Sequence, residues 1–352
     1  MELPLAAEAY KKIPVTSLRK LHKKTIFLTG GTGFIGKWLL HFFQWIKKNY
    51  EIEFKLIVLT RDPNRFLNEY KELVSDVEFM SGDVRDFSKT SFSEIDYVIH
   101  GATSTDASLN QKDPLFCFDT VIEGTKNILN LAKKSGAKKI LLLSSGAVYG
   151  RQNLEISHQK EDFSCSFDIN NPDFVYHEAK RAAEMLASLY HKQFGLSVNS
   201  ARCYAFVGPY LPIDQHFAVG NFIKNYISEE TLLIKGDGSA LRSYMYPSDL
   251  VVWLLTILLE GESNKSYNVG SEDSISILEL AQLVRNSGDE ACKELGIESK
   301  KMDIKILEKA SQKIPERYVP CTELARRSLN LKNFIPIKTA IKETIKWHLN
   351  NR

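Results

Sequence analysis

The chain has few cysteines, and their positions form no recognisable framework. Its 352 residues include five, at positions 117, 165, 203, 292 and 321. An odd number with irregular spacing and no Cys-x-x-Cys argues against a disulfide scaffold and favours reduced thiols, as in a cytoplasmic protein. The eight histidines show no zinc-ligand spacing, so the sequence predicts no metal site.

Long hydrophobic runs and excess charge are also lacking. No apolar stretch approaches the roughly 18 residues of a membrane span, and the longest, Leu250 to Leu259, suits a buried core helix. The net charge of +3 comes without a basic stripe interleaved with aromatics, so we expect no nucleic-acid partner. Residues 1–24 lack the apolar core of a signal peptide. We interpret them as an N-terminal extension that packs or makes a subunit contact, with membrane or partner binding by its basic end as the alternative.

The chain does contain a regular alternation of candidate strands and helices, which predicts a parallel sheet. Beyond Cys203 the pattern is shorter and more interrupted by glycine and proline, so we expect a domain at 25–203 and a lobe at 204–352 interleaved with it. The predicted fold class is α/β, a Rossmann-like doubly wound parallel sheet with a smaller C-terminal α/β lobe that binds substrate. The predicted strands are 25–29, 54–60, 77–81, 97–100, 139–144 and 198–203, and the predicted helices include 37–46, 121–134 and 176–194.

A glycine-rich loop joins the first predicted strand to the helix at 37–46. Its glycines let the backbone turn tightly and approach a pyrophosphate, which then binds the free N–H groups at the helix N-terminus. The alternative is a plain glycine-rich turn. We interpret the loop as a dinucleotide cradle, whose expected contacts are Gly30, Thr32, Gly33, Phe34, Ile35 and Gly36.

Tyr176 and Lys180 form a second informative pair. Being four residues apart on a predicted helix, they lie on one face, one turn from each other. A phenol with a pKa of about 10 is a poor base at neutral pH, and a nearby ammonium stabilises its phenolate. Ser145 follows a buried strand, at the edge where ligands of parallel sheets bind. The pair alone also fits an exposed helix face; with Ser145 it predicts a site of proton transfer.

Together these motifs resemble the extended short-chain dehydrogenase/reductase family, specifically its nucleotide-sugar epimerase, dehydratase and reductase members. The resemblance runs from about Thr25 to the C-terminus and includes Gly236-Asp237-Gly238 with Arg242, and the stretch from Arg317 to Trp347. It implies an NAD(P)-dependent enzyme acting on a nucleoside-diphosphate sugar. The implied catalytic residues are Ser145, Tyr176 and Lys180.

The resemblance also implies a role for each site residue. Tyr176 exchanges a proton with a sugar hydroxyl, expected at C4, that Ser145 orients, while Lys180 lowers the Tyr176 pKa and holds the nicotinamide ribose. Asp83 and Val84 are expected at the adenine. The residues expected beside the nicotinamide ribose are Gly101, Ala102 and Thr103.

At the substrate end, Arg242 matches the family arginine that clamps the diphosphate, a task that suits a guanidinium. Asn221 and Arg317 are further candidates for sugar or phosphate contacts, and a surface position is the alternative for both. The family also implies a homodimer through the helices at 121–134 and 176–194, although apolar faces on these helices fit a core equally well.

The end of the second strand bears on the choice of cofactor. An acidic residue there usually bonds the ribose 2′-hydroxyl of NAD, whereas an arginine accommodates the 2′-phosphate of NADP. Here Thr60 takes the place of the acid, and Arg61 follows it. We therefore favour NADP(H) over NAD(H), with Asp62 as the ribose ligand of an NAD enzyme as the alternative.

The two residues after Ser145 bear on the type of reaction. Family dehydratases have an Asp-Glu pair here and family decarboxylases a glutamate, but this chain has Gly146 and Ala147. Without these acid/base groups, hydride transfer with a Tyr/Ser proton relay remains, which indicates an epimerase or a 4-ketoreductase. A 4,6-dehydratase is the alternative if a carboxylate comes from elsewhere. The candidates for that carboxylate are Glu161, Asp162 and Glu178.

The sequence disfavours two other classes of function. A non-catalytic NADP(H)-binding subunit is disfavoured because such relatives typically lose the Tyr, Lys or Ser. Reduction of a small carbonyl compound is disfavoured by Arg242 and the full C-terminal lobe. Val121 and Ala205 stand where relatives often have asparagine, which suggests a sugar or base different from that of UDP-galactose.

Overall fold

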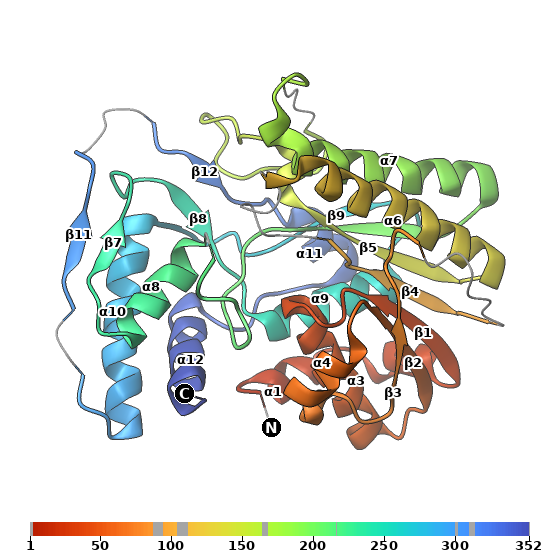
Figure 1. Cartoon of the computed structure of the whole chain (residues 1–352), viewed down its shortest axis with the longest axis horizontal. Helices are drawn as coiled ribbons and strands as arrows, with labels where there is room; N and C mark the ends of the chain where they lie inside the picture. Colours follow the sequence, from red (N-terminus) through yellow and green to blue (C-terminus); the bar gives the residue numbers. More distant parts are fainter. Residues whose placement is uncertain are drawn as a thin grey trace.

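A parallel seven-stranded sheet dominates the structure, a computed structural model that describes residues 3–86, 94–103, 112–163, 168–215, 217–299, 302–309 and 314–351. The strand order is β3-β2-β1-β4-β5-β6-β9, and Figure 1 shows the sheet on the right-hand side. The predicted Rossmann-like parallel sheet is confirmed. Its strands are β1 (Lys24–Thr29), β2 (Phe54–Thr60), β3 (Val77–Ser81), β4 (Tyr97–His100), β5 (Lys139–Ser145), β6 (Val198–Cys203) and β9 (Ser266–Val269).

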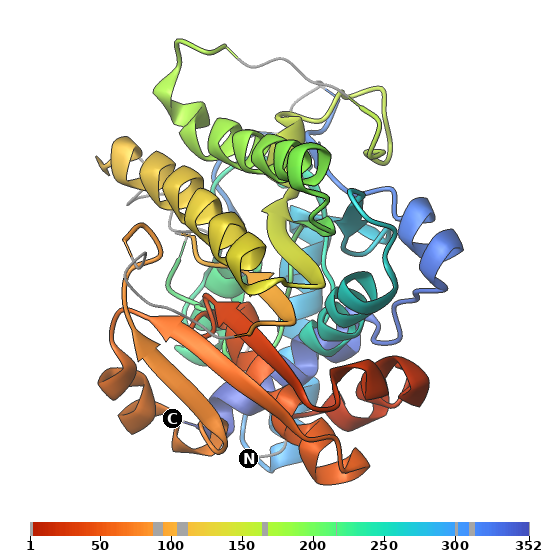
Figure 2. The same cartoon turned by 90° about the vertical axis from the view of Figure 1, so that its right-hand side faces the viewer.

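Helices cover both faces of this sheet (Figure 2). Alternate strand residues point to opposite faces, and the sequence supplies apolar side chains for both. Phe27 and Leu142 join one hydrophobic cluster with the first pair of helices, while Ile26 and Leu141 join a second cluster with the other pair. The first pair is α6 (Pro114–Ser135) and α7 (Val175–Phe194), and the second is α3 (Phe34–Tyr50) and α9 (Pro247–Glu260).

The helix α9 contains the longest apolar run and is buried from Pro247 to Leu259. The interpretation of 250–259 as a core helix is therefore confirmed. Within the ranges that the structure describes, no helix has both the length and the apolarity needed to cross a bilayer.

A smaller lobe of helices and two short sheets lies beside the carboxyl ends of the large sheet's strands (Figure 1). The strands β7 and β8 of this lobe precede β9 in the sequence, yet β9 pairs with β6 in the large sheet. The chain therefore passes through the lobe and returns to the large sheet. The sequence pattern did not indicate β9, which has only four residues. The lobe contains β7 (Leu232–Ile234), β8 (Leu241–Ser243), β10 (Ser274–Ser276), β11 (Ile304–Ile306), β12 (Arg317–Tyr318), α8 (Ala218–Ile227), α10 (Ile277–Leu295) and α12 (Ile337–Asn350).

The N-terminal segment packs against the large domain. Its helices α1 (Ala6–Tyr10) and α2 (Val15–Leu18) lie against α9. The Tyr10 ring is fully buried, with its centroid 5.0 Å from that of Phe42 and 5.4 Å from that of Trp45 on α3. The segment thus belongs to the hydrophobic core. The remaining short helices are α4 (Pro63–Glu69) and α11 (Glu323–Leu329).

Replacing Tyr10 with alanine tests the importance of this packing. Removing a fully buried aromatic ring is expected to lower the free energy of unfolding by about 3–5 kcal/mol. Urea unfolding followed by circular dichroism measures the change. Val15→Ala is the control, since Val15 is 41% exposed. A Tyr10→Ala protein as stable as the wild type would contradict a core role for this segment.

Candidate active site

A cavity of about 1370 Å³ lies between the carboxyl ends of the strands and the smaller lobe. Its volume exceeds the roughly 300–1,000 Å³ of a pocket for one small ligand, which leaves room for a cofactor and a substrate. Asn221 and Arg317 are not among the lining residues. The other predicted site residues all line it: Gly30, Thr32, Gly33, Phe34, Ile35, Gly36, Arg61, Asp83, Val84, Gly101, Ala102, Thr103, Ser145, Tyr176, Lys180 and Arg242.

The glycine loop forms one end of the cavity, between β1 and α3. Gly30 has a left-handed backbone, with φ of +73°, and a Cβ atom there would lie 2.6 Å from the carbonyl carbon of Gly101. A Cβ atom on Gly36 would lie 2.3 Å from the carbonyl oxygen of Gly30. Only glycine fits at these two positions, and the resulting open cradle at a helix N-terminus fits a dinucleotide pyrophosphate.

A buried hydrogen-bond network supports the neighbouring wall of the cavity. The Thr29 hydroxyl lies 2.8 Å from Nδ1 of His100 and accepts from the backbone N–H groups of Gly101 and Ala102. Burial lowers the pKa of His100 to about 3, so its ring is neutral. His100 therefore has a structural role at the end of β4, where it helps to fix the loop that follows.

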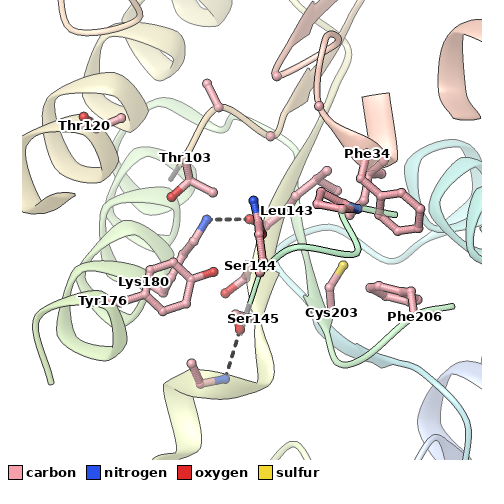
Figure 3. A pocket seen from close by; sticks show the side chains of 18 of the residues that line it. Phe34, Thr103, Thr120, Leu143, Ser144, Ser145, Tyr176, Lys180, Cys203 and Phe206 are labelled. Carbon is pink, nitrogen blue, oxygen red and sulfur yellow. Dashed lines mark hydrogen bonds between the residues drawn. The ribbon is translucent and has the colours of Figure 1, made fainter. Parts of the chain in front are cut away.

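Lys180 and Tyr176 project from α7 into the cavity toward the end of β5 (Figure 3). Lys180 is only 3% exposed, and its ammonium donates a 2.8 Å hydrogen bond to the carbonyl oxygen of Leu143. Burial lowers the pKa of Lys180 to about 8. The ammonium lies 5.8 Å from the centroid of the Tyr176 ring.

The pKa of Tyr176 differs from the sequence-based expectation. Burial raises this pKa above its usual value, although a hydrogen bond with Ser145 opposes the shift. The Lys180 ammonium is directed at Leu143 and not at the phenol. In this structure Tyr176 is therefore a neutral phenol near pH 7, a form that donates a proton.

Two further tyrosines close the cavity around Ser145. Tyr204 and Tyr318 lie with ring centroids 4.6 Å apart. Burial raises the pKa of Tyr318 to about 12, and a hydrogen bond with Ser145 opposes this shift. A Cβ atom on Gly146 would lie 2.7 Å from both Cζ of Tyr204 and the hydroxyl of Tyr318. The two rings thus occupy the space that any side chain at position 146 would need.

Arg61 and Asp83 also line the cavity. Arg61 is exposed and lines the cavity, whereas the neighbouring Asp62 caps α4 by accepting a 3.0 Å hydrogen bond from the N–H of Arg65. Arg85 binds the Asp83 carboxylate through Nε and Nη2, each at 3.0 Å, and these bonds lower the pKa of Asp83. Arg61 therefore lines the cavity at this position, whereas Asp62 is engaged in capping α4.

Strand pairing separates the arginines of the smaller lobe. Tyr318 lies opposite Arg242 in the pairing of β12 with β8, so these two share one face, and both line the cavity. Arg317 lies opposite Leu241 and therefore belongs to the other face. The roles predicted for Asn221 and Arg317 stay predictions.

Sequence reasoning missed several aromatic side chains of the cavity. Tyr318 lies in the stretch from Arg317 to Trp347 that carries part of the family resemblance. The sequence pattern does not show whether Tyr318 or Arg317 faces the cavity; the pairing of β12 with β8 does. The additional lining residues include Tyr204, Phe206, Phe217, Tyr244 and Tyr318.

The described residues contain no group of three or more His, Cys, Asp or Glu side chains that could hold a metal ion.

Comparison with known proteins assigns the family. The model of the NAD dependent epimerase/dehydratase family matches residues 26–270. The chain belongs to this family. UDP-glucuronic acid decarboxylase 1 of Danio rerio is 28% identical to it over 348 residues, which cover 95% of this chain and 75% of the relative.

Solved structures share the fold. UDP-glucose 4-epimerase of Thermotoga maritima, determined with UDP-glucose, has a TM-score of 0.74 and 21% identity, covering 93% of this chain and 99% of that one. A dTDP-glucose 4,6-dehydratase of Streptomyces venezuelae, determined with NAD, has a TM-score of 0.75 and 22% identity, covering 93% and 98%. The predicted family, an NAD(P)-dependent enzyme family of the extended short-chain type, is confirmed.

Replacing Gly30 with alanine tests the cradle. The new Cβ atom meets Gly101, and the left-handed backbone disfavours alanine, so the loop must shift. We expect affinity for NAD(P)H to fall at least about tenfold, or 1.4 kcal/mol, by titration calorimetry. Gly236→Ala is the matched control, because nothing lies within 4 Å of its Cβ position. Unchanged affinity of a folded Gly30→Ala protein would contradict cofactor binding at this loop.

Proposed function

We propose that this protein transfers hydride at a sugar carbon of a nucleoside-diphosphate sugar, with C4 as the expected position, as an epimerase or a 4-ketoreductase. One observation carries the proposal. Ser145, Tyr176 and Lys180 line one cavity with the glycine loop, while the space beside Ser145 is filled by Tyr204 and Tyr318. The site therefore combines a proton relay with a dinucleotide cradle.

The chain's own residues move the proton in this mechanism. A bound NAD(P) supplies or accepts the hydride, which is the cofactor's chemistry. The neutral Tyr176 phenol donates its proton to the oxygen of a sugar carbonyl as that carbon is reduced, and takes it back in the reverse direction. Ser145 hydrogen-bonds the same oxygen and orients it. Lys180 holds positive charge beside the phenol and binds the nicotinamide ribose.

The carboxylates predicted to support a dehydratase do not lie in the cavity. Elimination of water needs a carboxyl group within hydrogen-bond reach of the sugar. None of the three carboxylates proposed to supply it lines the cavity. Glu161, for example, accepts a 2.9 Å hydrogen bond from the backbone N–H of Asn268. Gly146 has no side chain and so supplies no carboxyl group for decarboxylation either. This disfavours a decarboxylase, although similar proteins include UDP-glucuronic acid decarboxylase 1 of Danio rerio.

The substrate end supports a diphosphate. We propose that Arg242 clamps it, since a guanidinium makes paired hydrogen bonds to phosphate oxygens and Arg242 lines the cavity. The smaller lobe at 204–352 supplies this arginine and so acts as the substrate-binding part, interleaved with the cofactor-binding part at 25–203. Contacts of Asn221 or Arg317 with the sugar nucleotide remain part of the proposal.

For the cofactor we propose NADP(H) in preference to NAD(H). Asp62, the alternative ribose ligand, is already engaged as the cap of α4. Arg61 remains to meet a 2′-phosphate.

We also propose a homodimer and a cytoplasmic location. The outer faces of α6 and α7 expose Leu115, Met185 and Leu189, which supports a subunit contact there; light scattering of the purified protein tests it. The free thiols support a reducing compartment; they are Cys117, Cys203, Cys292 and Cys321, while Cys165 lies outside the described residues.

The Tyr176→Phe variant tests the proposed reaction. Loss of the phenol hydroxyl removes the proton donor, so kcat should fall by about 10²–10⁴-fold, while affinity for NAD(P)H stays nearly unchanged. The assay incubates UDP- and dTDP-sugars, and their 4-keto forms, with the protein and deuterated NAD(P)H. Transfer of deuterium to C4 identifies a ketoreductase. Interconversion of C4 epimers without net use of cofactor identifies an epimerase.

Two results would contradict the proposal. One is wild-type turnover by the Tyr176→Phe protein. The other is release of carbon dioxide from UDP-glucuronic acid at a rate exceeding any reaction at C4.

The Arg61→Ala variant tests the cofactor preference. A hydrogen bond to a charged group is worth about 1.5–3 kcal/mol, so affinity for NADPH should fall by about 10–100-fold. Affinity for NADH, which lacks the 2′-phosphate, should change little. Equal losses for the two cofactors, or a wild-type preference for NADH, would show that Arg61 does not select NADP(H).

A further inference from the structure

A largely buried carboxylate lies on the same helix as Tyr176 and Lys180. Glu184 follows Tyr176 and Lys180 on α7 at intervals of four residues, so all three lie along one face of the helix. Its side chain is only 12% exposed. The proposed mechanism gives this group no role.

The Glu184 carboxylate collects donors from three neighbouring strands. Ser144, the residue before Ser145 on β5, donates its hydroxyl proton to Oε1. Arg202 on β6 donates from Nη2 to Oε2 at 2.7 Å and from Nε to Oε1 at 3.1 Å. Ser266 on β9 donates to Oε2 at 3.2 Å. Because Ser144 and Arg202 are direct partners in the pairing of β5 with β6, one carboxylate binds both.

Arg202 extends the network to the turn that follows Ser145. Its side chain is 15% exposed, and its Nη1 donates to the Tyr149 hydroxyl and, at 3.0 Å, to the backbone oxygen of Glu161. Tyr149 ends the short helical turn Gly146–Tyr149. The network therefore holds the chain on both sides of Ser145.

We propose that Glu184 and Arg202 are positioning residues, which fix the register between β5, carrying Ser145, and α7, carrying Tyr176 and Lys180. The inference rests on the proposed function, because it assumes that these three side chains act together. The reaction needs their oxygen and nitrogen atoms in one arrangement, and a displacement of about 1 Å is enough to cost about 100-fold in rate. Neither Glu184 nor Arg202 lines the cavity, so both act through their neighbours.

Geometry favours positioning over stability as the role of this pair. A buried ion pair adds little net stability, because removing two charges from water offsets much of their attraction. It does impose direction, since the planar guanidinium binds a carboxylate in a fixed orientation. A pair of apolar residues would fill the same space without setting the register.

The experiment measures three variants in the same assay as Tyr176→Phe. Glu184→Met/Arg202→Met replaces the pair with apolar residues of similar size and is expected to fold, as such replacements often do. Ser144→Ala leaves the ion pair intact and cuts its link to β5. Glu184→Gln removes one charge. Glu290→Gln is the matched control, since Glu290 forms an ion pair with Lys338 on the surface.

We expect the double variant to lose up to about 100-fold in kcat, with KM for the sugar nucleotide and the melting temperature near wild type. Ser144→Ala should lose less, and Glu290→Gln nothing. A purely structural role would lower the melting temperature and leave kcat of the folded protein unchanged.

The pH profile gives an independent readout. The groups that face the Lys180 ammonium are Glu184, Tyr176, Cys117, Cys203 and His100. Glu184 is the only carboxylate among them, and its attraction raises the pKa of Lys180. Its replacement in Glu184→Gln should therefore move the alkaline limb of kcat to lower pH. The Ser144→Ala protein keeps this charge and should keep the wild-type limb.

The two proposals fail in different ways. A folded double variant with wild-type kcat, beside an inactive Tyr176→Phe protein, overturns the positioning role and leaves the proposed function standing. An active Tyr176→Phe protein overturns the proposed function itself. If Glu184→Gln does not fold, the double variant and Ser144→Ala still decide.

Discussion

Accommodation of the buried Lys180 ammonium is the constraint on which the rest of the active site depends. A cation that is 3% exposed needs nearby acceptors or negative charge, and the chain supplies the Leu143 carbonyl at 2.8 Å and Glu184 one helical turn away. Both partners connect α7 to β5. The same requirement that keeps the charge inside the protein therefore brings Tyr176 toward Ser145, and Arg202 in turn balances Glu184.

Two tyrosine rings limit the size of the residue that follows Ser145. Family dehydratases and decarboxylases are expected to place carboxyl groups at the positions of Gly146 and Ala147. Here a carboxyl group at 146 would collide with Tyr204 and Tyr318. A carboxylate at position 146 would therefore require Tyr204 and Tyr318 to move or to be replaced as well. The Tyr204 hydroxyl is buried and has no hydrogen-bond partner among the described residues. It is therefore a polar atom in the aromatic wall that Tyr204 and Tyr318 form beside Gly146.

Local patterns carried most of what the sequence could predict. Six of the seven parallel strands, the glycine loop and the pair Tyr176/Lys180 depend on spacing within short segments, and the structure has each near its expected bounds. The four-residue strand β4 was predicted within the regular alternation of strands and helices, whereas β9, of the same length, lies beyond Cys203 in the more interrupted part of the chain and was missed. Tyr318 and Tyr204 were missed because their position depends on pairing between distant segments. The raised pKa of Tyr176 depends on burial and on where the Lys180 ammonium points, and neither can be read from a four-residue spacing.

The order of the strands explains why the cavity depends on both the large sheet and the smaller lobe. β8 and β12 carry Arg242 and Tyr318 side by side, yet β9 lies between them in sequence and pairs with β6 in the large sheet. Asn268 on β9 binds the Tyr149 hydroxyl and the backbone oxygens of Gln159 and Cys321. The approach to Tyr318 is thereby tied to the turn after Ser145. The smaller lobe cannot swing away as an independent domain without breaking these bonds, so the fold sets the distance between Arg242 and Ser145 across the cavity.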